Sequence, residues 1–188
     1  MRFWKTKLII SALLLATAST VWAKATPAEC QAALERMQGM GNVQALLDEA
    51  YGYAVLPGIG KGGFVVGGAA GSGCVFAGAT QTGTVKMRQV TVGLQLGGQA
   101  YSELILFKNK DAYDEFITGS FEFGADATAV ALTYGAAAGA GTEGSSASAG
   151  KTKGTASWKH GMAIMTLEKG GLMYEASVGG QKFSYEAL

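Results

Sequence analysis

Glycine is the residue that most constrains what this chain can fold into. The 188 residues include 29 glycines but only two prolines, and this glycine share is about twice the usual one. The glycines follow no Gly-X-Y period, which excludes collagen. Several stand as pairs within or beside apolar segments, at 62–63, 67–68 and 97–98. Glycine inside a strand permits bends, bulges and close packing. We therefore predict an antiparallel α+β fold with a strongly curved or barrel-like glycine-rich sheet.

Two other roles for the glycines fit the sequence less well. The segment GIGKGG at 58–63 departs from the phosphate-binding pattern GxxxxGK[ST], because Gly62 follows Lys61. Gly135 and Gly139 have the spacing of a helix-packing motif in membranes. However, no stretch after residue 23 has 18 uninterrupted apolar residues with good helix formers. The structural role is favoured.

The first 23 residues have the pattern of a secretory signal peptide. Arg2, Lys5 and Lys7 precede an uncharged run at 8–20, and Val21 and Ala23 offer small residues for cleavage. The alternative is an uncleaved anchor, but the run is shorter than the roughly 20 residues that a spanning helix needs. We predict cleavage after Ala23 and an exported chain, periplasmic or secreted and possibly peripheral on a membrane. Residues 24–188 are predicted to form one domain without a transmembrane helix.

Charge further limits the partners. The signal segment holds three of the 15 basic residues and none of the 14 acidic ones. The remainder therefore has 12 basic and 14 acidic side chains, a net charge of −2. A dedicated nucleic-acid-binding domain would usually be strongly basic, so no nucleic-acid partner is predicted.

Helical patterns occupy a small part of the chain. Residues 27–50 are predicted to be helical with a break at 39–41, and Asn42 is the expected N-cap of the second helix. A short helix is predicted at 110–117, with Asn109 as its N-cap.

The rest of residues 51–188 is predicted to be mainly β-structure. Pro57 is expected to end the first strand, and turns are expected at 71–73, 168–171 and 179–180. The pair at 97–98 should reverse the chain or form a bulge. The predicted strands cover 53–56, 63–70, 74–80, 84–96, 101–107, 121–134, 162–167, 172–178 and 182–185. Residues 139–157 are nearly all small or polar, which predicts a mobile loop.

Cys30 and Cys74 are the only cysteines. In an oxidising compartment they could form one disulfide, or both could be buried free thiols. The chain has no CxxC motif, third cysteine or histidine cluster, so no metal site and no cofactor are predicted.

The sequence gives little support for an enzyme. His160 is the only histidine and the GxSxG motif is missing. We interpret His160 as a solvated residue in a turn. Asp126, near Glu122, is either a buried hydrogen-bonding group or a functional one. No recognisable acid–base pair is assembled, and a non-enzymatic protein is predicted.

Three groups of segments together resemble the SYLF domain family. The first contains GYAVLP at 52–57, KGGFVVGG at 61–68 and GSG at 71–73. The second contains VGLQLGGQ at 92–99, ELILF at 103–107 and AYDEF at 112–116. The third contains FGADA at 123–127, EKGGLM at 168–173 and the glycine pair at 179–180. They occur in the family's order from residue 51 to 185.

The resemblance implies a non-enzymatic domain that binds acidic phospholipid headgroups. The ligands of eukaryotic relatives are phosphoinositides, and some of these relatives associate with actin. Eukaryotic members enter the membrane with a basic amphipathic N-terminal helix. Residues 28–50 here are more acidic than basic, and an exported chain would not meet cytosolic phosphoinositides or actin. Lipid binding is therefore the property that carries over best.

Lysine and arginine side chains are the candidates for binding an anionic headgroup. Lys61 is expected in a glycine-flanked turn, Lys86 and Arg88 on one strand face, and Lys151 and Lys153 on the predicted loop beside Lys159. We predict non-enzymatic binding of phospholipid headgroups or an anionic membrane surface in the cell envelope. The alternative is a structural glycine-rich envelope protein that self-associates, and a homo-oligomer is possible.

Overall fold

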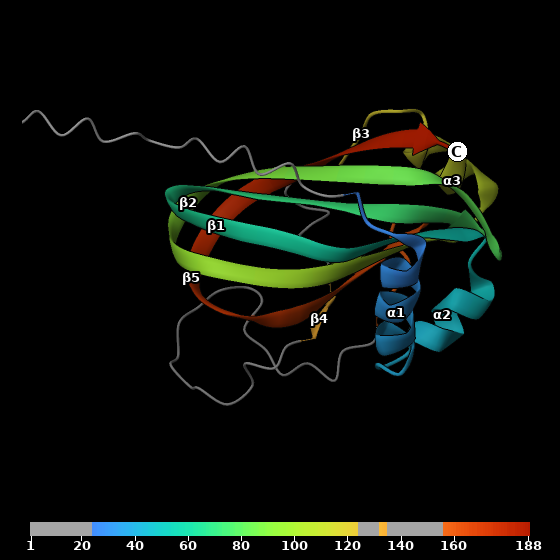
Figure 1. The fold of residues 1–188 in the computed structure, drawn as a ribbon, viewed down its shortest axis with the longest axis horizontal. Coiled ribbons are helices and arrows are strands. Elements are labelled where there is room, and N and C mark those ends of the chain that lie inside the picture. The colour runs from blue at the N-terminus through green and yellow to red at the C-terminus, as the bar shows by residue number, and fades with distance from the viewer. Residues whose placement is uncertain (1–23, 124–131, 135–155) are drawn as a thin grey trace, which may run out of the picture.

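The computed structural model describes residues 24–123, 132–134 and 156–188, and Figure 1 shows an α+β fold. The helices are α1 (Pro27–Gln38), α2 (Val43–Glu49) and α3 (Lys110–Phe116). The strands are β1 (Gly52–Ala77), β2 (Thr80–Phe107), β3 (Phe121–Phe123), β4 (Leu132–Tyr134) and β5 (Met162–Ala187). The expected signal segment, Asp126, Lys151, Lys153 and most of the expected loop lie outside the described residues.

Three long strands form most of the sheet. The order of hydrogen-bonded strands is β1-β2-β5-β3, and β4 pairs with β5. All these pairings are antiparallel except that of β4, which is parallel to β5. Within the described strands, the pairings leave β1 and β3 at the two ends of this order. The antiparallel α+β prediction is confirmed, whereas closure into a barrel is not.

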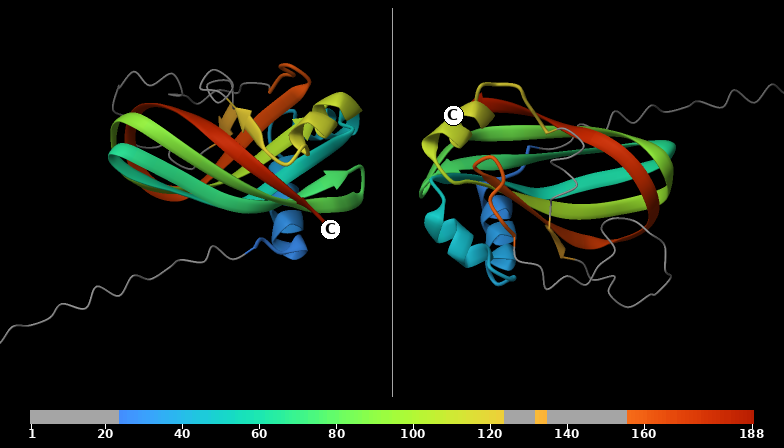
Figure 2. Two further views of the ribbon diagram at one scale, coloured as in Figure 1. Left: turned by 90° about the horizontal axis from the view of Figure 1, so that it is seen from above. Right: turned by 180° about the vertical axis from the view of Figure 1, so that it is seen from behind.

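The long strands bend back on themselves. Figures 1 and 2 show them turning at the end of the molecule opposite the helices. In β1 the turn follows Gly63, where an added Cβ would lie 2.4 Å from the Cα of Gly67. The next residues include Val65, which has a positive φ of 63°. Since the β1–β2 register also shifts between Phe64 and Val66, the hairpin curves here without losing its pairing.

The sharp turn predicted at 71–73 is wrong. β1 runs through this segment, and its two halves touch. A Cβ on Gly73 would lie 2.1 Å from the carbonyl oxygen of Val55, and one on Gly71 would lie 2.7 Å from that of Gly58. The glycines therefore permit one part of the backbone to lie against another, instead of reversing the chain.

The other predicted breaks are also continuous strand. Pro57 produces a register shift between Leu56 and Ile59 while β1 continues, which an edge strand tolerates because its unpaired side needs no donor. β2 continues through Gly97, although its φ is 126°. β5 continues through both predicted turns, 168–171 and 179–180. The predicted strand 121–134 is represented by β3 and β4, and 124–131 lie outside the described residues.

The curved sheet separates two apolar clusters. The inner cluster joins both halves of the bent strands, with Ile59 and Val75 from β1 and Phe183 from β5. Tyr113 and Phe116 of α3 complete it. The outer cluster packs α1 and α2 onto the other face of the sheet. In the described ranges, no helix combines the length and hydropathy needed to cross a membrane.

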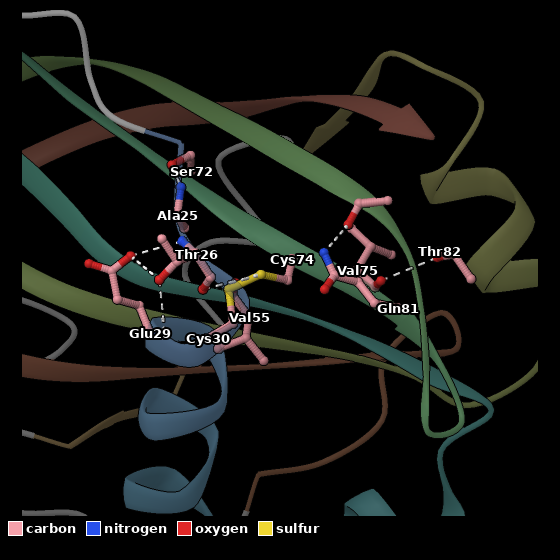
Figure 3. The surroundings of a disulfide bond; sticks show 11 residues. Ala25, Thr26, Glu29, Cys30, Val55, Ser72, Cys74, Val75, Gln81 and Thr82 are labelled. Atoms are coloured by element: carbon pink, nitrogen blue, oxygen red, sulfur yellow. Dashed lines mark hydrogen bonds between the residues drawn. A yellow bond between two sulfur atoms is a disulfide. The ribbon is translucent and has the colours of Figure 1, made fainter. Parts of the chain in front are cut away.

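Helix α1 is fixed to β1 at its first turn. Pro27 opens the helix, and Thr26 and Glu29 form a reciprocal capping box. Cys30 and Cys74 form a disulfide, and the backbone N–H of Ala25 donates to Ser72 Oγ at 2.9 Å (Figure 3). The start of the helix is thereby attached to the second half of β1.

The two predicted N-cap asparagines behave differently. Asn109 accepts a hydrogen bond from the N–H of Ala112, as expected for a cap. Asn42 makes no side-chain cap. Its amide instead donates to the carbonyl of Ala156 at 2.9 Å and accepts from the N–H of the same residue at 3.0 Å. Ala156 is buried, so this end of the predicted loop is attached to α2.

Candidate functional site

Six apolar side chains are exposed where β1 and β2 bend. Phe64 has 72% of its surface exposed and Val90 has 65%, so neither contributes to the core. We call the set the bend patch; it contains Phe64, Val65, Val66, Val90, Val92 and Leu96. Contiguous exposed apolar surface of this kind typically marks an interaction site.

The strand register brings these residues together. Phe64 is opposite Leu96, and Val66 is opposite Val92. Because directly paired side chains in an antiparallel sheet lie about 5 Å apart, each pair forms one continuous apolar surface. The bend lies at the end of the molecule away from the helices (Figure 1).

Lys86 and Arg88 extend the same face of β2. Both are exposed, and they alternate with the buried Val85 and Met87. Since side chains two residues apart share a strand face, this face presents in order Lys86, Arg88, Val90 and Val92. On the outer face of β2, two basic side chains therefore lie next to the apolar residues of the bend patch.

The neighbouring strands contribute charges of both signs. Lys182 of β5 is exposed and pairs with Arg88. Glu122 of β3 is also exposed and pairs with Lys182. The face beside Lys86 thus has three basic groups and one acidic group in adjacent register positions.

Lys61 has a different position from the one expected. It lies within β1 and not in a turn, and it is half-buried. It shares a strand face with the buried Ile59, without a register shift between them. The structure therefore places Lys61 on the inner face, away from the outward-facing Lys86 and Arg88.

The turn that contains His160 lies just before the first residue of β5, Met162. His160 is exposed with a φ of 50°, as expected for a solvated turn residue. The adjacent Lys159 is exposed, and its backbone pairs with Met162. Because Met162 lies opposite Phe107 at the end of β2, this lysine is remote from the bend patch.

A buried carboxyl group was missed by the sequence analysis. Glu103 is fully buried on the inner face, where Gln181 Nε2 donates to its Oε2 at 3.0 Å. Burial raises the pKa of Glu103 to about 7, and the hydrogen bond from Gln181 opposes that rise. A lone glutamate within the apolar strand segment 101–107 was the available signal.

The protonation state of Glu103 follows from its hydrogen bonds. Glu103 Oε1 and Gln181 Oε1 are buried and have no hydrogen-bond partner among the described residues. The amide oxygen Gln181 Oε1 can only accept a hydrogen bond, and Glu103 Oε1 can donate one only if the carboxyl group is protonated. One proton on Glu103 would let acid and amide pair through two hydrogen bonds, satisfying both oxygens.

Comparison with known proteins places this fold in a family. The family model Ysc84, described as "Las17-binding protein actin regulator", matches residues 88–186, just over half of the chain. No solved structure matches the chain.

One curated relative is "Beta cell expansion factor A" of Aeromonas veronii. It is 29% identical over 143 residues, which are 76% of this chain and 48% of that protein. The chain therefore spans about half the length of this relative. With the family match covering the bent β2–β5 pair, the chain belongs to the Ysc84 family of SYLF domains, a family linked to lipid or actin-related binding.

Proposed function

We propose that the bend patch binds the surface of an anionic phospholipid membrane in the cell envelope. The observation that carries this proposal is the exposure of six apolar side chains at one end of the sheet. Next to them, the outer face of β2 carries the basic side chains of Arg88 and Lys86. Membrane-surface proteins use this order, with apolar groups at the acyl boundary and cations at the headgroups. The expected export of the chain is consistent with such a location.

The two parts of the surface have separate roles. Phe64 and the valines would leave water on docking, which contributes roughly 25 cal/mol per Å² of apolar surface buried. Val92 and Arg88 are four residues apart on β2, about 14 Å along a strand. Arg88 and Lys86 would therefore lie near the headgroups while the patch contacts the acyl boundary. Each cation contributes about 1 kcal/mol at an anionic surface.

Replacing Phe64 with serine should weaken vesicle binding at least about tenfold, because burial of one large apolar side chain is lost. The measurement is co-sedimentation with phosphatidylglycerol vesicles. Leu188→Ser is the matched control, since Leu188 is also an exposed apolar residue, at 79%, but lies outside the patch. Equal weakening by both variants would contradict the proposed surface.

Neutralising Lys86 and Arg88 together with glutamine should weaken binding roughly thirtyfold at low salt. The same variant should bind neutral phosphatidylcholine vesicles as the original chain does. Lys108→Gln with Lys110→Gln is the control, because it removes two exposed cations at the start of α3, outside the bend patch. Binding that is insensitive to salt and to Lys86 and Arg88 would rule out the electrostatic contribution.

Self-association is the competing outcome of the same experiments. If the patch covers a second copy of the chain, the protein's mass should increase with concentration without lipid, and Phe64→Ser should keep it monomeric. That result, together with no vesicle binding, would overturn the membrane proposal.

A further inference from the structure

A basic pocket lies between α1 and the sheet. It has a volume of about 270 Å³, and its lining includes Lys24, Glu29, Arg36, Gly58, Ser72 and Lys169. These residues come from the start of the described chain, α1, both halves of β1, and β5. The pocket is small by the standard of drug-sized ligand sites, which begin at roughly 300 Å³.

The lining has an excess of positive charge. Of the residues that line the pocket, three carry cationic side chains and one carries a carboxylate. The carboxylate, Glu29, already accepts hydrogen bonds from the N–H and hydroxyl of Thr26, at 2.8 and 2.7 Å. These bonds, led by the one from the backbone, lower the pKa of Glu29. Lys24 pairs with Glu186 at 3.2 Å, so Arg36 and Lys169 are the main source of the excess.

Lys169 is the cation most affected by its surroundings. It donates a hydrogen bond to the carbonyl of Pro57. Burial lowers the pKa of Lys169, the charge of Arg36 lowers it further, and Glu29 acts in the opposite direction. An anion between Lys169 and Arg36 would offset the desolvation cost of the charged lysine and reduce the repulsion between the two cations.

The wall of the pocket is preorganised. Ser72 is fixed by the N–H of Ala25, two positions from the disulfide-bonded Cys74, and Glu29 is fixed by the capping box (Figure 3). A site whose groups are already positioned loses less conformational entropy on binding.

We propose that this pocket binds a small phosphate-bearing anion between Arg36 and Lys169. Arginine recognises phosphate with paired N–H donors, and lysine contributes a point charge. Gly58 and Phe64 are six residues apart on β1, up to about 20 Å. The pocket and the bend patch share no residue, so this proposal does not depend on the membrane proposal.

The test is calorimetric titration of the protein with glycerol 3-phosphate. We expect saturable binding that weakens about tenfold or more in the Arg36→Gln, Lys169→Gln double variant. The matched control is Lys108→Gln with Lys110→Gln, which removes two exposed cations outside both the pocket and the bend patch and should bind the phosphate ester normally. Circular dichroism of each variant checks that the fold is retained.

Vesicles containing phosphatidic acid distinguish a soluble ester from a lipid headgroup. If glycerol 3-phosphate binds and the vesicles do not reduce this binding, the pocket is assigned to soluble phosphate esters. Competition by vesicles that contain phosphatidic acid, and not by neutral phosphatidylcholine vesicles, assigns it to a headgroup. No binding of either probe, or equal binding by the pocket and control variants, overturns the proposal.

Discussion

Replacing Cys30 and Cys74 together with alanine is expected to lower the free energy of unfolding by about 4 kcal/mol. The disulfide spans a sequence separation of 44 residues, and closing a loop of that length removes about this much chain entropy from the unfolded state. Urea unfolding measures the loss. With a slope of about 2 kcal/mol per molar urea, the midpoint should fall by about 2 M.

Reduction of the original protein provides the control for packing. Both sulfur atoms are buried, so alanine also creates small cavities. A reductant should destabilise the original protein but leave the double alanine variant unchanged. If reduction leaves the midpoint unaltered, the disulfide contributes nothing measurable to stability.

Raising the pH from 4.5 to 8 is expected to remove about 3 kcal/mol of stability through Glu103 alone. Its pKa is about 7 in the folded protein and near the ordinary glutamate value when unfolded. The folded state therefore holds a proton that the unfolded state has released. This contribution is fully present below the unfolded pKa and is lost as the pH rises through the folded pKa. Urea unfolding across this pH range measures the loss.

Glu103→Gln is the matched variant for this prediction. A glutamine at 103 can donate to Gln181 Oε1 and accept from its amide, so both polar groups are satisfied without a proton. Between pH 4.5 and 8, the free energy of unfolding of the variant should rise by about 3 kcal/mol relative to that of the original protein. Parallel pH profiles would show that Glu103 is not protonated in the folded state.

The sequence predicted the helices better than the strands. The boundaries of α1 and α3 follow from Pro27, the Gly39 break and Asn109, which act through local hydrogen bonds. The turn predicted at 71–73 failed because its two glycines also permit close contact between two parts of the backbone. Only the folded chain shows that Gly73 lies against Val55, which is distant from it in sequence.

The candidate site was predicted only in part. The alternation in β2 correctly placed Lys86 and Arg88 on one face, because strand periodicity is local. The bend patch could not be found this way, since Phe64 and Val92 have the pattern of buried strand residues. Their exposure depends on where the sheet ends and on which helices cover it. The same is true of Arg36 and Lys169, which are brought together from α1 and β5.

The position of β2 between β1 and β5 has a consequence for folding in the cell. The β1–β2 hairpin joins near neighbours in sequence, such as Ala77 and Thr80, but the β2–β5 pairing joins residues as distant as Gly83 and Ala187. Pairings of such long range are slow to form. Until the C-terminal strand arrives, one entire side of β2 is an unpaired edge with valines on its outer face. Such edges pair readily with other chains, so the nascent protein should depend on folding helpers during synthesis.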